Sequence, residues 1–270
     1  MCTEWLVLIL GGGDLGTGVA HRLSRCGFRV IVGELAQPTV VRRTVAFASA
    51  VYQNGIEVEG IQAISASDSA EALSLVAAEI VAVMTASADR LRSMFLPHVI
   101  VDARMAKRNL GTNPEDAPIV VGLGPGFTAG LDVHAVVETN RGHHLGRVIL
   151  SGTAEPDTGI PSPVQGHASN RVLWSPCHGT LRTMASIGQS VTKGQQVASV
   201  DTVPVSAPIQ GILRGLAHDG LVVEKGQKVG DVDPRGVREY CFTISDKARG
   251  VAGGVLEAIL LLQRRLTTPA

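Results

Sequence analysis

Apolar residues follow two alternating patterns along the first hundred positions of the chain. Continuous apolar runs, such as 5–10 and 29–33, are typical of strands that are buried on both faces of a sheet. Between these runs, apolar residues recur at helical spacing, as at Val19, Ala20 and Leu23. The alternation predicts further helices over 67–79 and 87–95 and further strands over 80–86 and 98–104. We therefore predict an α/β domain with a mostly parallel sheet and helices on both faces.

One segment of this domain has no clear period. Residues 40–60 fit a helix or a hairpin, and the Asn54-Gly55 pair is a common hairpin turn. We expect a hairpin or an irregular insert here.

A glycine pattern follows the first apolar run. Gly11, Gly13 and Gly16 fit G-x-G-x-x-G, and Glu34 lies 34 − 16 = 18 positions further on. In dinucleotide-binding folds, such glycines let the backbone approach a pyrophosphate at a helix N-terminus, and the acid binds a ribose hydroxyl. Asp14 would repel a pyrophosphate unless it caps the helix or points away. The pattern predicts a Rossmann-like domain, with a pocket that is empty or adapted to another ligand as the alternative.

Further polar and glycine-rich loops follow later strands of the predicted sheet. Ligands of open α/β sheets bind outside the carboxyl ends of the strands, where these loops lie. The loop at 122–130 can offer backbone N–H groups to an anion, or it is a turn that only reverses the chain. The predicted cofactor-binding residues are Gly11, Gly13, Asp14, Gly16, Glu34, Asp102, Arg104, Lys107, Gly122, Gly124, Gly126, Thr128, Arg141, His143 and His144.

The last residues of that set belong to a polar run at 132–144. A strand over 134–140 would place His134 and Glu138 on one face, which allows a zinc or iron site. The run has no recognisable ligand spacing, so we assign no metal. Anion binding by Arg141 and His143, and surface or capping histidines, are the alternatives.

The second half of the chain contains an internal duplication. Residues 175–201 match residues 207–233 at a shift of 32, with 13 of 27 positions identical. Two copies are too few for a solenoid, but they can form one compact unit with an internal two-fold. The pattern resembles the barrel-sandwich hybrid fold of biotinyl and lipoyl domains. That resemblance implies a small all-β domain with a carrier lysine on the hairpin that joins the halves.

No lysine occupies that hairpin, which corresponds to 200–208. Lys193 and Lys225 lie in the earlier Lys-Gly-Gln turns of the two copies. We therefore predict a non-carrier module that covers the crevice of the first domain, docks a partner or is purely structural.

The chain ends with a predicted helix. Ser245 is a suitable N-cap, and apolar residues recur at helical spacing from Ala248 to Leu266. This helix packs back on the first domain or forms a contact in a homo-oligomer. The expected domains are 1–170, 171–236 and 237–270, docked rather than tethered.

Composition narrows the possible partners and locations. With 24 residues of each charge sign and only 3% aromatics, the chain lacks the features of a nucleic-acid binder. Its apolar stretches are too short to span a bilayer, and no secretory signal is visible. Four cysteines without paired spacing suit a reducing compartment. We expect a cytoplasmic protein without nucleic-acid or membrane partners. Cys177 and Cys241 are either buried thiols or members of a sulfur or selenium relay.

Several motifs together resemble one family. "GGGDLGTGVAHRL", "VDARMAK", "VGLGPGFTAGLDVHAVVETNRGHHLGRV", "DVDPRG" and "SDKARGVAGGVLEAIL" are similar to the YqeB family of accessory proteins found with selenium-dependent molybdenum hydroxylases. The resemblance implies a role in maturing such hydroxylases, with a hydroxylase subunit as partner and a molybdopterin-type cofactor as a possible cargo. It supplies no established catalytic residues.

Three functions remain open at this point. The first is a cofactor-maturation factor that binds a phosphate-bearing ligand, a nucleotide such as NAD(P) or a molybdopterin-type cofactor. The second is an NAD(P)-dependent oxidoreductase, for which Asp102, Lys107 or His134 would have to act as general acid or base. The third is a scaffold that docks an apo-hydroxylase without a small ligand.

Overall fold

The computed structural model describes residues 5–159 and 164–267, which form two compact units. The first unit contains Met1–Pro38, Phe47–Asp157 and Ile244–Ala270, and the second contains Thr39–Ala46 and Thr158–Thr243. These boundaries differ from the expected ones at 170 and 236. The short stretch Thr39–Ala46 belongs to the second unit because its backbone is bound there: the Leu216 N–H donates to the Val41 carbonyl at 2.8 Å.

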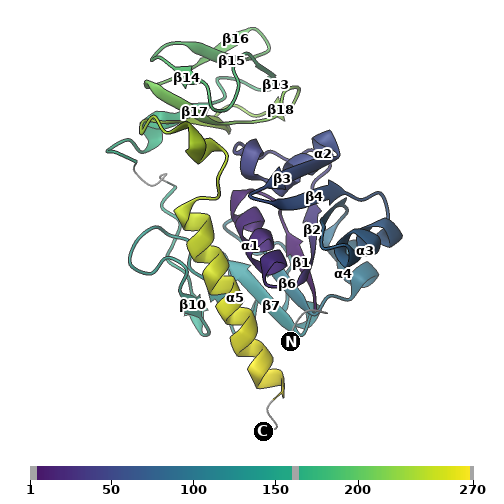
Figure 1. Ribbon diagram of the computed structural model, residues 1–270. Coiled ribbons are helices and arrows are strands. Elements are labelled where there is room, and N and C mark those ends of the chain that lie inside the picture. The colour runs from purple at the N-terminus through teal and green to yellow at the C-terminus, as the bar shows by residue number, and fades with distance from the viewer. Residues whose placement is uncertain (1–4, 160–163, 268–270) are drawn as a thin grey trace. The chain divides into compact units, whose positions relative to one another are not determined.

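The first unit is built on a nine-stranded, mostly parallel sheet (Figure 1). Its order is β10-β9-β7-β6-β1-β2-β5-β4-β3, and only the two edge pairs, β10–β9 and β3–β4, are antiparallel. Strand order reverses between β1 and β6, because strands β2 to β5 lie on one side of β1 and strands β6, β7, β9 and β10 lie on the other. The strands are β1 Leu6–Leu10, β2 Arg29–Glu34, β3 Gly55–Val58, β4 Ile61–Ser65, β5 Val81–Thr85, β6 Val99–Asp102, β7 Ile119–Leu123, β9 Ala135–Val137 and β10 Val148–Ile149.

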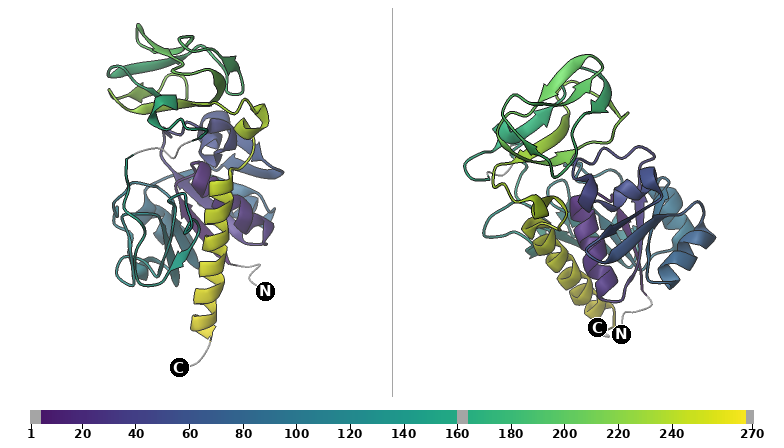
Figure 2. Two further views of the ribbon diagram at one scale, coloured as in Figure 1. Left: turned by 90° about the vertical axis from the view of Figure 1, so that its left-hand side faces the viewer. Right: turned by 45° about the horizontal axis from the view of Figure 1, so that its top comes forward.

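Helices cover both faces of this sheet, as the sequence pattern predicts. On one face, α1 (Asp14–Arg25) and α5 (Asp246–Thr267) run side by side, and a Cβ at Gly18 would lie 2.9 Å from the Ala248 side chain (Figures 1 and 2). On the other face, α3 (Ser69–Ala77) and α4 (Ala88–Phe95) contribute Val76 and Leu91 to a core cluster that includes Leu8. The four central strands β1, β2, β5 and β6 are almost entirely buried, which explains their continuous apolar runs.

The ambiguous segment contains a hairpin, but its turn is not the predicted one. A short helix α2 (Ala50–Gln53) ends at Asn54, which caps it in the left-handed conformation at φ 63°. Strands β3 and β4 then pair across Glu59 and Gly60, both with positive φ. The Asn-Gly pair therefore ends a helix instead of forming the hairpin turn.

Shorter elements complete the first unit. Strand β9 is shorter than the strand expected over 134–140, although the Glu138 N–H still donates to the Arg147 carbonyl at 3.0 Å. The remaining short elements are the antiparallel pair β8 Thr128–Ala129 and β11 Gly152–Thr153, and the 3-10 turns Phe47–Ser49 and Pro114–Asp116.

The second unit is all-β and reproduces the 32-residue duplication strand by strand. Strand β14 of the first copy pairs with β17 of the second, and β18 of the second copy pairs with β13 of the first. Each half thus supplies a strand to the other, and the apolar residues of both halves form one core cluster. The strands are β12 Val172–Trp174, β13 Gly179–Thr183, β14 Ser190–Val191, β15 Gln196–Val200, β16 Val203–Ser206, β17 Gly211–Leu216, β18 Val222–Val223 and β19 Lys228–Asp233, with 3-10 turns at Arg43–Val45, Ser169–Arg171 and Arg238–Cys241.

The turns of the two copies are also equivalent. Gly194 and Gly226 have φ values of 86° and 79°, so Lys193 and Lys225 occupy matching tight turns. The β15–β16 hairpin turns at Asp201, at φ 50°, and not at a lysine. Taken together, the chain is a mixed α/β protein with a large mostly parallel sheet, small antiparallel sheets and a C-terminal helix.

Candidate functional site

The loops after β1 and β6 meet at the point where strand order reverses. Gly11 has a φ of 96°, and a Cβ added there would lie 3.1 Å from the carbonyl of Ala103 and from the Cα of Arg104. Ligands of open α/β sheets bind outside the carboxyl ends of the strands at such a point. The first part of the candidate site is therefore this rim of the sheet, within the first unit.

Helix α1 begins at this rim without a side-chain cap. Its N-cap is Gly13, which has no side chain to accept a helix N–H. The first hydrogen bond within the helix runs from the Thr17 N–H to the Gly13 carbonyl. The N–H groups of Asp14, Leu15 and Gly16 thus have no acceptor within the helix, and the helix dipole adds positive potential there. A Cβ at Gly16 would overlap the Gly11 carbonyl oxygen, so only glycine lets the helix start this close to the strand.

Glu34 ends β2, at the position where a dinucleotide-binding fold holds a ribose hydroxyl. Its carboxylate accepts hydrogen bonds from the Gly12 N–H at 2.7 Å and the Leu35 N–H at 2.8 Å. The side chain therefore stabilises the glycine loop in this structure.

Asp102 and Arg104, which the sequence analysis predicts to bind a ligand, bind each other in this structure. Asp102 is 1% exposed and accepts from the Arg104 Nε at 3.0 Å and from the Thr112 hydroxyl at 2.7 Å. Arg104 also donates to the Thr112 hydroxyl at 2.9 Å. A buried carboxylate needs such partners, so this pair fixes the loop after β6.

The second glycine-rich loop is also closed by its own contacts. Gly122 lies inside β7 against the Phe127 ring, and the Gly124 N–H donates to the Val137 carbonyl at 2.9 Å. A Cβ at Gly126 would lie 2.5 Å from the Arg108 nitrogen, and the Thr128 N–H donates to Asp132 at 2.7 Å. Of the two alternatives for this loop, these contacts favour a turn that reverses the chain over a loop that offers its N–H groups to an anion.

Basic side chains near the start of α1 come from distant parts of the chain. Lys247, in the first turn of α5, was missed by the sequence analysis. Burial lowers the pKa of its ammonium group, and the charges of Asp14, Glu138, Lys107 and Arg141 all act on it. Its position two residues after the N-cap, Ser245, inside the SDKARG motif is a signal that could have indicated it.

The predicted basic residues of this group are engaged with acids. Lys107 lies 3.5 Å from the Asp157 carboxylate, and Arg141 forms an ion pair with Asp246 in the first turn of α5. Both ion pairs are partly exposed, so they are weak and can rearrange for a charged ligand.

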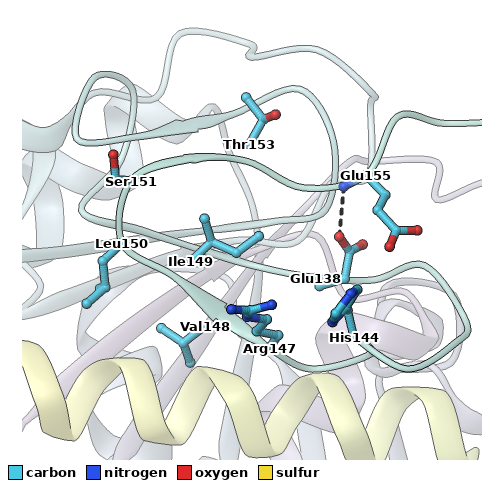
Figure 3. A pocket seen from close by; sticks show the side chains of 9 residues that line it. All are labelled: Glu138, His144, Arg147, Val148, Ile149, Leu150, Ser151, Thr153 and Glu155. Atoms are coloured by element: carbon cyan, nitrogen blue, oxygen red, sulfur yellow. Dashed lines mark hydrogen bonds between the residues drawn. The ribbon is translucent and has the colours of Figure 1, made fainter.

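A pocket of about 380 Å³ lies over the β9–β10 edge of the sheet (Figure 3). Glu138 is 2% exposed and accepts from the N–H groups of Thr139, Asn140 and Glu155, each at 2.7 Å. It therefore holds the two loops that form the pocket. The lining residues are Glu138, His144, Arg147, Val148, Ile149, Leu150, Ser151, Thr153 and Glu155.

The structure places the two predicted histidines differently. His144 lines this pocket and packs edge-on against His143, with ring centroids 5.0 Å apart. His143 is not a lining residue of the pocket, so only one of the pair can contact its contents.

The polar run at 132–144 is held by structural hydrogen bonds. The Val120 N–H donates to Nδ1 of His134 at 3.0 Å, and burial lowers the pKa of that imidazole. Within residues 5–159 and 164–267, no group of three or more His, Cys, Asp or Glu side chains is arranged to hold a metal ion.

The cysteines differ in exposure, with Cys26 exposed, Cys177 half-buried and Cys241 buried. Burial raises the pKa of the Cys241 thiol, which disfavours the reactive thiolate. Cys2 lies outside the described residues. Among the helices that the structure describes, none is long and apolar enough to cross a bilayer.

Comparison with known proteins finds a curated relative that is similar in sequence to this chain. It is 47% identical over 260 residues, or 96% of its length, to "Uncharacterized protein YqeB" from Escherichia coli (strain K12). Over this region the chain is a homologue of YqeB. This supports the resemblance to the YqeB family, although the chain spans only 48% of YqeB itself. No protein-family model matches the chain.

Solved structures share only a distant likeness with this YqeB homologue. The product-bound ectoine utilization protein EutE (DoeB) from Ruegeria pomeroyi is 15% identical, with 86% of this chain and 85% of that chain covered and a TM-score of 0.26. A succinylglutamate desuccinylase from a Silicibacter species is 13% identical, with 84% of each chain covered and a TM-score of 0.25. At these scores the likeness carries no argument about function.

Proposed function

We propose that this YqeB homologue is an accessory protein that binds a phosphate-bearing ligand at the rim of the large sheet. The observation that carries the proposal is the uncapped N-terminus of α1 at the reversal of strand order. Three N–H groups there lack acceptors within the helix, and a helix N-terminus favours phosphate. On this proposal the first unit is a Rossmann-type fold, and the second is a barrel-sandwich hybrid that has no carrier lysine.

Nearby side chains support an anion at this position. Lys247 is half-buried, and it supplies a cation beside the start of α1. Asp14 balances part of that charge, so a phosphate would bind to the backbone N–H groups and to Lys247 together. Glu34 holds the loop in shape and can accept from a ribose hydroxyl only by sharing its oxygens with the Gly12 and Leu35 N–H groups.

The biological role of the ligand follows from the family resemblance alone. We propose that the ligand is a nucleotide or a molybdopterin-type cofactor, handled during the maturation of selenium-dependent molybdenum hydroxylases. The partner would then be a hydroxylase subunit. An oxidoreductase is less well supported, because Asp102 and His134, two of its three candidate acid-base groups, are bound to structural partners.

Calorimetry tests the ligand-binding part of the proposal. The purified chain is titrated with pyrophosphate, ADP, NAD⁺ and a pterin phosphate. We expect saturable binding of at least one of them. An absence of binding with all four would overturn the proposal.

Two variants locate the binding. Gly13→Asp adds a carboxylate that caps α1 and competes with a phosphate for the same N–H groups, without removing a packing contact. Lys247→Gln removes the half-buried cation. Each should weaken binding about tenfold or more, since hydrogen bonds to charged groups contribute about 1.5–3 kcal/mol. Lys193→Gln, in an exposed turn of the second unit, is the matched control and should bind normally.

A further inference from the structure

The pocket over β9 and β10 has two chemically different ends, one with carboxylates and one with the Leu150 side chain. Figure 3 shows Glu138, Glu155 and His144 together at one end, and Leu150 and Ser151 at the other. A volume of about 380 Å³ lies in the range of small-molecule sites in proteins. The pocket therefore suits a small molecule with one charged part and one apolar part.

Arg147 is the cationic group of this pocket. Its backbone joins Glu138 and His144, because the Arg147 carbonyl accepts from the Glu138 N–H and its N–H donates to the His144 carbonyl. The guanidinium itself lines the pocket and has no hydrogen-bond or ion-pair partner among the residues that the structure describes. A guanidinium in this position can bind a carboxylate through two parallel hydrogen bonds.

Glu155 is the anionic group with capacity for a ligand. Its Oε2 accepts from the Asn140 amide at 2.5 Å, while Oε1 has no protein donor within the described part of the chain. Glu138 is occupied by three backbone N–H groups and serves to hold Glu155 in place. A ligand ammonium group would therefore bind to Glu155, an exposed residue whose carboxylate lines the pocket and accepts from the Asn140 amide.

The rest of the wall is aliphatic and hydroxyl-bearing. Val148, Ile149 and Leu150 are half-buried, so each presents part of its side chain to solvent or to the pocket. Covering such surface with an apolar group is favourable by about 25 cal/mol per Å². An aliphatic side chain on the ligand would pack against this surface and remove it from water.

We propose that this pocket is a binding site for a small zwitterion of the aliphatic α-amino acid class. The ligand carboxylate binds to Arg147, its ammonium binds to Glu155, and its side chain packs on Ile149 and Leu150. The site is separate from the start of α1, and the proposal does not depend on phosphate binding there. On this proposal the chain has a second binding site for a small molecule, in addition to the one at the start of α1.

Calorimetry on the full chain with L-leucine and two analogues tests the proposal. 4-Methylpentanoate keeps the carboxylate and side chain but lacks the ammonium, and 3-methylbutylamine lacks the carboxylate. We expect L-leucine to bind and each analogue to bind at least tenfold more weakly. Arg147→Gln and Glu155→Gln should each weaken L-leucine binding about tenfold or more. Arg90→Gln and Glu115→Gln, exposed residues outside the pocket, are the matched controls.

The outcomes separate this proposal from the one on phosphate. If L-leucine, L-valine and L-isoleucine all fail to bind, or if both pocket variants bind normally, the proposal is wrong. Equal affinity for L-leucine and 4-methylpentanoate would also overturn it, because the ammonium would then contribute nothing. Gly13→Asp should leave L-leucine binding unchanged, and Arg147→Gln should leave pyrophosphate binding unchanged.

Discussion

At the scale of single residues, several buried or half-buried polar groups of the first unit have protein partners. Glu138 accepts from three N–H groups, and His134 accepts one N–H at Nδ1. Asp102 is instead neutralised by Arg104. Each arrangement avoids the cost of a buried polar group without a partner. Asp102 and His134, two of the three candidate acid-base groups, therefore have structural partners.

One consequence is a fall in stability under mildly acidic conditions. Burial lowers the pKa values of His21 and His134, so the unfolded chain takes up protons before the folded chain does. Their stabilising contribution is complete above the ordinary histidine pKa of about 6.5 and is lost as the pH falls below it. Urea denaturation should give a lower free energy of unfolding at pH 5.5 than at pH 7.5.

The variant His134→Asn checks the source of this effect. The asparagine oxygen can accept the Val120 N–H in place of Nδ1 but cannot be protonated in this range. The difference between pH 7.5 and pH 5.5 should therefore shrink. An unchanged difference in the variant would show that His134 does not contribute.

A second prediction at this scale concerns two helical glycines. Alanine at Gly16 would overlap the Gly11 carbonyl oxygen, and overpacking of this kind costs roughly 1–3 kcal/mol. Alanine at Gly253, where a Cβ meets nothing within 4 Å, should stabilise the chain by about 0.5–1 kcal/mol. Chemical denaturation of both variants measures the difference. Equal effects at the two positions would contradict the close approach of α1 to β1.

At the scale of elements, the sequence predicted those whose burial leaves a local pattern. The strands of the large sheet read as apolar runs because both of their faces are covered. Helices α3 and α4 were predicted, and Asp68 and Ser87 accept N–H groups as their N-caps. The end of α2 was missed because Asn54 favours both hairpin turns and left-handed helix caps. Only tertiary structure distinguishes the two.

The duplicated unit provides a prediction about matched glycines. Gly179 and Gly211 have φ values of 157° and 159°, which L-residues rarely adopt. Alanine at Gly211 would overlap the Asp233 backbone, whereas alanine at Gly179 would meet the movable Asp201 carboxylate. We expect Gly211→Ala to destabilise the second unit by about 2 kcal/mol or more, and Gly179→Ala by less.

Tryptophan fluorescence can follow that unit alone. The chain has two tryptophans, and Trp174 is the one in the second unit, so a Trp5→Phe background isolates its signal. Urea midpoints of the two glycine variants are then compared in this background. A larger loss at Gly179 would contradict the structure.

At the scale of the whole molecule, the site joins parts that are far apart in the sequence. Lys247 lies 247 − 14 = 233 positions after Asp14, and it reaches the start of α1 only because α1 and α5 pack side by side. The glycine motif indicated the loop after β1 because its pattern is local. The loop at 122–130 had a similar composition, yet its packing against Arg108 closes it, and no local pattern could reveal that.

The central claim is that the first turn of α1 binds phosphate. Amide ¹⁵N–¹H correlation spectra of the full chain, recorded during a titration with pyrophosphate, test it most directly. We expect the resonances of Asp14, Leu15 and Gly16 to shift together and to saturate, while that of Gly253 stays in place. Saturable binding that leaves these three amides unmoved, or no binding at all, would contradict the account.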